Sequence, residues 1–270
     1  MTIEDRYAHY TRLKFDRPHP NVLRITMSNG KMNSADKAMH AELAEIWHDV
    51  DRDPTVNAAI ITGEGVNFSA GGDFQMIEEM ISDFDERARS WKEARDIVYG
   101  IINCSKPVVS AMRGVAVGAG LVCGLLSDIS IATPECRLVD GHTRLGIAAG
   151  DHAAIVWPLL CGMAKSKLYL LLCDPVNGAE AERIGLISLV AEDADLDEKA
   201  VQVATRLATG AQSAIRFTKY SLNNWLRQAG PTFDTSLALE FMGLVSPDLR
   251  EGLNSHKEKR KPQFNPFSPL

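Results

Sequence analysis

Apolar residues occur along this chain at two spacings, and each spacing predicts a different element. Short apolar runs bounded by Gly, Pro or Asp predict strands, and they cover Val22–Met27, Ala58–Thr62, Val108–Met112, Asp128–Thr133 and Ile187–Ala191. Between the first two runs, apolar residues from Leu43 to Val50 recur at the spacing i, i+3, i+4 and i+7, which predicts an amphipathic helix. Further helices are expected over 83–102, over 153–161 with Pro158 breaking its regularity, and over 179–184. This alternation of strands and helices predicts an α/β fold.

The C-terminal part of the chain has a different pattern and is expected to be helical. From Leu196 onward apolar residues share helix faces, most clearly from Phe233 to Leu244. Ser246-Pro247 is a helix-start signal, and three prolines within Pro262–Leu270 predict an extended arm. We therefore expect an α/β core over residues 1–195 and a C-terminal helical region over residues 196–270.

The stretch from Lys106 to Asp151 carries the first candidate chemistry. Its strand leads into Gly114-Val-Ala-Val-Gly-Ala-Gly120, where small residues at a helix start allow backbone N–H groups to approach a ligand oxygen. His142 and Asp151 follow in a glycine-rich loop. A backbone anion site followed by a base and its carboxylate suits acyl chemistry. The alternative interpretation is a buried strand–helix–strand unit whose glycines serve close packing.

Composition and charge exclude several classes of protein. With 270 residues, 45% of them hydrophobic and 24% charged, the chain is typical of a soluble globular protein. Its net charge of −6 argues against nucleic-acid binding. The five cysteines form no CxxC pair and suggest neither a disulfide framework nor a metal site. The N-terminus resembles no signal peptide, and the longest uncharged run is shorter than the roughly 20 residues of a membrane span. We expect a cytoplasmic protein without a membrane partner.

Several short motifs, weak singly but specific in this order and spacing, indicate a family. They are Asn33, Phe68-Ser-Ala-Gly-Gly-Asp73, Lys106-Pro-Val-Val-Ser-Ala-Met-Arg-Gly114, Val117-Gly-Ala-Gly120, Ser127-Asp128 and Glu251-Gly-Leu with Glu258-Lys-Arg-Lys-Pro262. The chain resembles the crotonase (enoyl-CoA hydratase/isomerase) superfamily over nearly its whole length. The resemblance implies a ClpP-like spiral of ββα units followed by a C-terminal helical layer for trimerisation or as a lid. It also implies a homotrimer or hexamer and an acyl-CoA substrate, with no cofactor besides the substrate's CoA.

The resemblance also implies roles for particular residues. In the family, two backbone N–H groups polarise the thioester carbonyl, and they map to Ala70 and Ala119. Further substrate contacts map to the glycine turns and to the basic tail, which holds CoA phosphates in hydratase-like members: Gly71, Gly72, Asp73, Gly118, Lys257 and Lys259. For Asp73 the alternative is a role in stabilising its own turn, and for the basic tail it is a solvated end of the chain.

The sequence departs from the hydratase pattern at both catalytic glutamates. Val122 stands at the first position, and valine cannot transfer a proton; His142 stands at the second. A His142–Asp151 pair resembles the β-diketone hydrolase branch, which cleaves C–C bonds by retro-Claisen chemistry. That branch also uses a glutamate from the C-terminal helices, and Glu240, on the apolar face of its predicted helix, is the match.

Each of these side chains also has a structural interpretation. His142 can be a structural histidine of a glycine loop, and Asp151 can cap the helix that begins near Ala153. Glu240 can form a buried ion pair with Arg144 or Arg216. His152 is expected to point away from Asp151's site.

Three functions remain open from the sequence. The first is an enoyl-CoA hydratase-like lyase in which His142 and Asp151 activate water next to an oxyanion hole. The second is a C–C bond hydrolase acting on a β-diketone without CoA. The third is a catalytically silent homologue that only binds a ligand, for which an acidic chain makes RNA an unsuitable partner.

Overall fold

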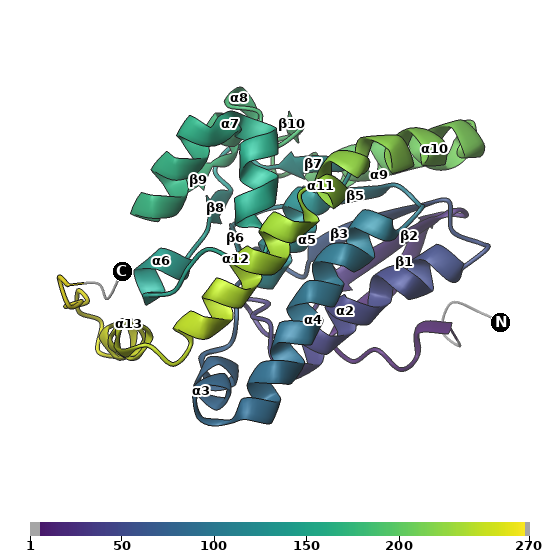
Figure 1. Cartoon of the computed structure of the whole chain (residues 1–270). Coiled ribbons are helices and arrows are strands. Elements are labelled where there is room, and N and C mark those ends of the chain that lie inside the picture. The colour runs from purple at the N-terminus through teal and green to yellow at the C-terminus, as the bar shows by residue number, and fades with distance from the viewer. Residues whose placement is uncertain (1–5, 268–270) are drawn as a thin grey trace.

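The computed structural model describes residues 6–267, and two β-sheets organise them (Figure 1). The six-stranded sheet has the order β1-β2-β3-β5-β7-β10. Its strands are β1 Leu13–His19, β2 Val22–Met27, β3 Ala58–Gly63, β5 Val108–Met112, β7 Ile129–Ala132 and β10 Leu189–Val190. β1 pairs with β2 antiparallel, and all other pairs are parallel. The strands predicted from apolar runs are therefore confirmed.

A second, four-stranded sheet has the order β4-β6-β8-β9. Its strands are β4 Ser69–Ala70, β6 Val115–Val117, β8 Arg137–Val139 and β9 Val176–Asn177. The chain gives one strand to each sheet in turn, as β3 then β4, β5 then β6, and β7 then β8. This is the spiral of ββα units that the family resemblance implies.

Every residue of β3 is buried, because helices cover both faces of the six-stranded sheet. Ala59 and Ile61 share a core cluster with α2 (Lys37–Arg52), and α4 (Phe84–Asn103) packs on α2. Ala58 and Ile60 alternate with them and pack with α9 (Leu196–Thr209) on the opposite face. The α9 helix thus completes the sheet's core, although the sequence boundary at residue 195 would separate it. The assignment of residues 196–270 to trimerisation or a lid remains a prediction.

The remaining helices follow most of the predicted pattern. Their bounds are α3 Phe74–Ser82, α5 Gly118–Leu126, α6 His142–Leu145, α7 Ala153–Leu172, α8 Gly178–Arg183, α10 Gln212–Leu222, α11 Asn224–Gln228, α12 Gly230–Gly243 and α13 Pro247–Lys257. Helix α3 was not predicted, although Met76, Ile77 and Met80 give it a buried apolar face, whereas β8 and β9, of three and two residues, are too short for a periodic pattern. Residues 262–267 form neither helix nor strand, and the rest of the predicted arm lies outside the described residues.

Helix α7 extends beyond its predicted end and bends at a different residue. Pro158 lies inside the helix, whereas the break is at Gly162, whose φ of 78° is in the left-handed region that glycine tolerates. Within residues 6–267, α7 is the one helix long and apolar enough to cross a membrane by length and composition, and 22% of its apolar window is buried. Its second half exposes Leu168, Leu171 and Leu172.

Asn33 holds together the loops that surround β4. Its side chain is fully buried, accepts from the Asn29 N–H at 3.1 Å, and donates to the carbonyls of Glu64 at 2.9 Å and Asn67 at 2.8 Å. Its own carbonyl accepts from Ser69 Oγ at 2.9 Å. The residue noted first in the family motifs is therefore a buried hydrogen-bonding centre beneath the β4 turn.

Replacing Asn33 by Ala should lower the free energy of unfolding by about 2–4 kcal/mol, because buried carbonyls lose their donors. Chemical denaturation monitored by circular dichroism measures this change. Asn21→Ala is the control, since the Asn21 amide makes a solvent-exposed hydrogen bond to Thr55 and should cost less than about 1 kcal/mol. An Asn33→Ala effect no larger than that of the control would contradict the structural role.

Candidate active site

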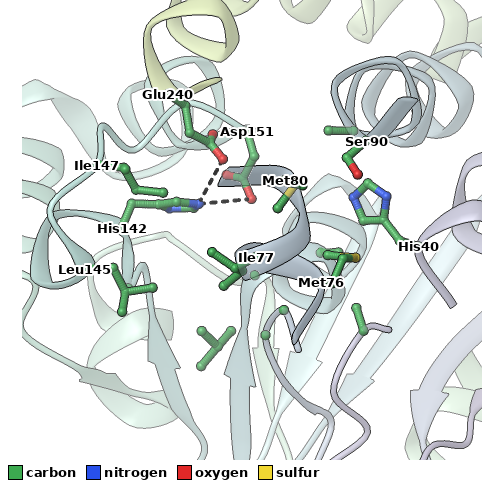
Figure 2. Close-up of a pocket in the computed structure, with 18 of the residues that line it drawn as sticks. His40, Met76, Ile77, Met80, Ser90, His142, Leu145, Ile147, Asp151 and Glu240 are labelled. Carbon is green, nitrogen blue, oxygen red and sulfur yellow. Dashed lines mark ion pairs between the residues drawn. The ribbon is translucent and has the colours of Figure 1, made fainter. Parts of the chain in front are cut away.

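A cavity of about 170 Å³ lies beside the β4 turn, between α3, α4, the start of α5, α6 and α12. Figure 2 shows His142, Asp151 and Glu240 on one side of it and His40 and Ser90 on the other. The walls between these two polar groups are mostly apolar: Met76, Ile77, Met80, Ile97, Ile147 and Leu244. A mostly apolar pocket with a few convergent polar groups is typical of a small-molecule site.

The β4 turn corrects the assignment of Ala70. The Ala70 N–H donates to the Met32 carbonyl at 2.9 Å, so it is used inside the fold. Two residues on, Gly72 forms a parallel bridge with Ala35 in which Ala35 bonds the backbone of Gly71 and Asp73. In that geometry the Gly72 N–H points away from Ala35, and it has no partner among the described residues. Gly72, which the sequence placed among the substrate contacts, is thus the available donor of this turn.

The start of α5 supplies a second available donor. Ala119 is the second residue of α5, and N–H groups in the first turn of a helix have no partner within the helix. Gly118 precedes it with φ +56°, and a Cβ added there would lie 3.3 Å from the Gly72 nitrogen and 2.8 Å from Gly71 Cα. The absence of a side chain at Gly118 therefore keeps the space beside the Gly72 N–H open. Gly72 and Ala119 both line the cavity.

His142 lies where three carboxylates converge. Its Nδ1 is 2.8 Å from Asp140 Oδ1. Figure 2 shows the contacts of its Nε2, which is 3.5 Å from Glu240 Oε1 and 3.8 Å from Asp151 Oδ2. The sequence-predicted trio of His142, Asp151 and Glu240 is therefore brought together. Asp140 is the carboxylate that orients the ring, and sequence reasoning missed it. Its place two residues before a candidate base was an available signal, since Asp side chains commonly bond to the residue two positions later.

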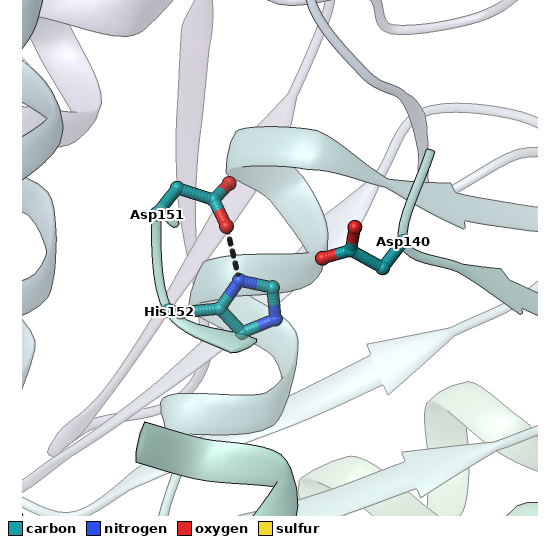
Figure 3. Close-up of side chains that lie close together, drawn as sticks. All are labelled: Asp140, Asp151 and His152. Atoms are coloured by element: carbon teal, nitrogen blue, oxygen red, sulfur yellow. Dashed lines mark hydrogen bonds and ion pairs between the residues drawn. The ribbon is translucent and has the colours of Figure 1, made fainter. Parts of the chain in front are cut away.

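His152 corrects a second expectation. Figure 3 shows its ring turned toward Asp151, with Nδ1 2.6 Å from Asp151 Oδ1. The prediction that His152 points elsewhere is wrong, because α7 starts at Ala153 and leaves His152 as a buried N-cap residue. Asp151 gives no side-chain cap to α7, so its suggested capping role is wrong as well.

Glu240 is buried on α12 and takes neither of the arginine partners considered from sequence. Arg144 donates to the Cys173 carbonyl, and Arg216 donates to Asn57. The charged partner of Glu240 is His142, and Glu240 Oε2 has no hydrogen-bond partner among the described residues. Val122 lines the cavity with an apolar side chain. The titratable side chains on this side of the cavity are therefore His142, Asp151 and Glu240.

Burial and charge shift the proton affinities of this group in opposing ways. Burial disfavours the imidazolium, but Asp140, Glu240 and Asp151 outweigh it and raise the pKa of His142 well above 6.5. Burial also opposes ionisation of Asp151, yet His152 and His142 lower the pKa of that carboxyl. For Glu240 burial exceeds the opposing effect of His142, so its pKa is raised. The three carboxylates together therefore favour the protonated form of His142.

The other predicted substrate contacts divide into two groups. Gly71 and Gly118 line the cavity with Gly72. Asp73 accepts from the Gln75 and Met76 N–H groups as the N-cap of α3, which is the turn-stabilising alternative. Lys257 forms an ion pair with Glu78. Lys259 follows α13 and does not line the cavity, so contact of the basic tail with CoA remains a prediction.

Two sets of side chains lie within metal-ligand spacing. One consists of Asp140, Asp151 and His152, and the other of His142, Asp151 and Glu240, each with ligand atoms within 4.8 Å of one another. A metal ion binds a neutral imidazole, whereas the raised pKa of His142 favours its protonated form, in which Nε2 carries a proton. The expectation of a metal-free site remains a prediction.

Comparison with known proteins places the chain in a family. The family profile described as Enoyl-CoA hydratase/isomerase matches residues 17–266. The 1,2-epoxyphenylacetyl-CoA isomerase of Escherichia coli K12 is 31% identical over 250 residues, covering 90% of this chain and 94% of that protein. The crotonyl-CoA hydratase of Syntrophomonas wolfei is 29% identical over 239 residues, covering 86% and 90%.

A solved structure agrees with these relatives. An enoyl-CoA hydratase/isomerase from Mycobacterium paratuberculosis has a TM-score of 0.86 and 33% identity, covering 91% of this chain and 98% of its own. The chain belongs to the enoyl-CoA hydratase/isomerase family of the crotonase superfamily, a family of enzymes that act on CoA thioesters.

Replacing Gly118 by Ala should lower kcat for a thioester substrate by about a hundredfold or more, because the new methyl group covers the Gly72 N–H. Gly141→Ala is the matched control: Gly141 also lines the cavity, but its added Cβ would meet only Val117 at 3.8 Å and its φ is −87°. Steady-state kinetics, with thermal melting to verify folding, test this. Equal kcat in the two folded variants would contradict the assignment.

Replacing Asp140 by Asn should lower the pKa of His142, because the carboxylate that most raises it is removed while an acceptor for Nδ1 remains. A reaction that needs neutral His142 then gains activity at lower pH than in the native protein. Histidine NMR titration and the pH profile of kcat/KM measure both effects. Glu93→Gln, which alters a partly buried carboxylate beside His40, should leave the His142 titration unchanged. An unshifted titration in Asp140→Asn would show that Asp140 does not set the pKa.

Proposed function

We propose that this protein is an enoyl-CoA hydratase-like lyase that uses a histidine in place of the two hydratase glutamates. The observation that carries the proposal is the position of His142, whose Nε2 lies beside Glu240 and Asp151 on the cavity that also holds the Gly72 and Ala119 backbone. A proton-transfer group and two backbone donors on one pocket are the parts that enolate chemistry requires.

In this proposal the Gly72 and Ala119 N–H groups bind the thioester carbonyl oxygen. As negative charge builds on that oxygen, two backbone donors in a water-poor pocket stabilise the enolate more than the substrate. Gly72 takes the role that the sequence assigned to Ala70, because the Ala70 N–H is bonded to Met32. Ala119 keeps its assigned role, supported by its place in the first turn of α5.

His142 transfers the proton in this proposal, with Asp140 orienting it. Once its ring has lost the proton held in the resting state, Nε2 accepts a proton from water, and the water oxygen adds to the enoyl double bond. Asp140, bonded to Nδ1, stabilises the imidazolium formed. The imidazolium then returns the proton to the α-carbon of the enolate. Glu240 and Asp151 lie beside Nε2 of His142, and the hydrogen bond between His152 and Asp151 fixes the position of the Asp151 carboxylate.

A C–C bond hydrolase is the second candidate, and one observation favours it. The β-diketone hydrolase branch resembled by the sequence uses a histidine, an aspartate and a C-terminal glutamate, and Glu240 and Asp151 both lie beside His142 Nε2. The same oxyanion donors would serve the enolate released by retro-Claisen cleavage. The relatives favour CoA chemistry, since both the E. coli isomerase and the Syntrophomonas hydratase carry CoA thioesters in their names.

An oligomer of identical chains fits the exposed apolar surface. Helix α7 exposes Leu171 with 68% of its surface accessible, and α10 to α12 expose Phe217, Trp225 and Met242. Large exposed apolar surfaces commonly mark interaction sites in soluble proteins. We therefore propose that these helices form contacts in a homotrimer or hexamer of a cytoplasmic enzyme, with CoA entering only as part of the substrate.

Replacing His142 by Ala should reduce turnover of enoyl-CoA substrates by at least about a thousandfold while CoA binding persists, because the proton-transfer group is lost and the thioester donors remain. Turnover is followed by loss of the enoyl absorbance, and binding by calorimetry. His9→Ala, at an exposed histidine, is the control. Unchanged turnover in His142→Ala would refute the role of His142. Cleavage of a β-diketone by native protein that does not bind CoA would favour the hydrolase.

A further inference from the structure

The side of the cavity away from His142 carries polar groups that the proposed reaction does not use. His40 on α2 and Ser90 on α4 both line the cavity, and Figure 2 shows them together at its far side. Both are buried, with 7% and 1% of their surface accessible. The residues between them and His142 are apolar, including Met76, Ile77 and Met80.

The hydroxyl of Ser90 has no hydrogen-bond partner within the described part of the chain. A serine in a helix ordinarily bonds to a carbonyl one turn earlier. A buried hydroxyl without a partner is destabilising, so such groups in native proteins call for an explanation. Glu93 is one turn further along α4 and contacts His40, which places Ser90 on the helix face toward His40.

His40 is held in a defined orientation. Its Nδ1 is 2.7 Å from Glu93 Oε2, and Arg89 Nη1 is 2.6 Å from the other oxygen of Glu93. A carboxylate accepts hydrogen bonds, so Nδ1 is the donor, and in the neutral tautomer with Nδ1–H the Nε2 atom is an acceptor. No hydrogen bond to Nε2 occurs among the described residues. The far side of the cavity thus offers an acceptor at Nε2 and a free hydroxyl at Ser90.

We propose that His40 and Ser90 form a polar subsite that binds a hydroxyl group at the distal end of the substrate's acyl group. A hydroxyl donates to His40 Nε2 and accepts from Ser90 Oγ, so it satisfies both groups at once. A carbonyl oxygen would satisfy Ser90 alone. A carboxylate would lie near Glu93, whose negative charge disfavours it. This inference rests on the proposed function, because it takes the reacting thioester to lie at Gly72 and Ala119.

The subsite determines which acyl groups are selected. An alkyl chain of the same length would leave His40 and Ser90 desolvated and unpaired, and a site built to bond a hydroxyl strongly rejects the analogue that lacks it. We expect native protein to prefer the hydroxylated member of a matched substrate pair by roughly tenfold or more in kcat/KM. The hydroxyl is aliphatic or phenolic, and the two sources are separate arms of the test.

The experiment uses pairs of enoyl-CoA thioesters of increasing length, alkyl and aryl, each with and without a terminal hydroxyl. Native protein, Ser90→Ala and His40→Leu are compared by kcat/KM and by calorimetric binding. Both substitutions should reduce the hydroxyl preference to within about threefold, while turnover of the deoxy substrate persists. Ser90→Ala should melt no lower than native protein, since it removes an unpaired hydroxyl, and it keeps the test decisive if His40→Leu does not fold.

Met80→Leu is the control, because it alters an apolar wall and should affect both members of a pair alike. Turnover without a hydroxyl preference in native protein would overturn the subsite and leave the proposed function standing. A preference that survives in Ser90→Ala would assign the hydroxyl to other groups. Failure of every thioester to bind or react would overturn the proposed function, and this inference with it.

Discussion

The close approach of two glycine turns is the constraint on which the rest of the site depends. β4 and β6 pair in parallel with Ala70 opposite Val117, so the chain leaving each strand passes the other at Gly72 and Gly118. A side chain at Gly118 would meet the backbone of the first turn at 2.8 Å. The backbone donors of Gly72 and Ala119 can share one pocket only because this contact has no side chain, and the buried Asn33 network holds the β4 turn in place from beneath.

The proton-transfer side of the pocket depends on concentrated charge. Three carboxylates around one imidazole raise its pKa even though burial alone would lower it. The cluster therefore binds protons tightly, and its stabilising effect on the fold is present below pH 6.5 and lost as pH rises through the raised pKa of His142. Asp140 contacts the inner nitrogen, Nδ1, while the outer nitrogen, Nε2, lies beside Glu240 and Asp151 at the cavity.

The same pocket has polar groups at both sides and apolar walls between them. This division separates the proposed chemistry near Gly72, Ala119 and His142 from the proposed selection of the acyl group at His40 and Ser90. Each set is supported from outside the cavity, His142 by Asp140 and His40 by Glu93. These contacts order the two imidazole rings when the protein folds. Substrate binding then loses less side-chain entropy, which favours a selective site.

The sequence by itself determined most strands of the six-stranded sheet, most of the longer helices, the α/β class and the choice of His142, Asp151 and Glu240 as candidates, because apolar periodicity and short motifs can be read along the chain. Only the tertiary structure decided which atoms meet. It assigned the Ala70 N–H to Met32, turned His152 toward Asp151 and placed Asp140 on His142, since these contacts depend on how β4, α6 and α7 pack. Ser90 and His40 lie on the same side of the pocket although they are fifty residues apart in the sequence. No local sequence pattern indicated that they would meet there.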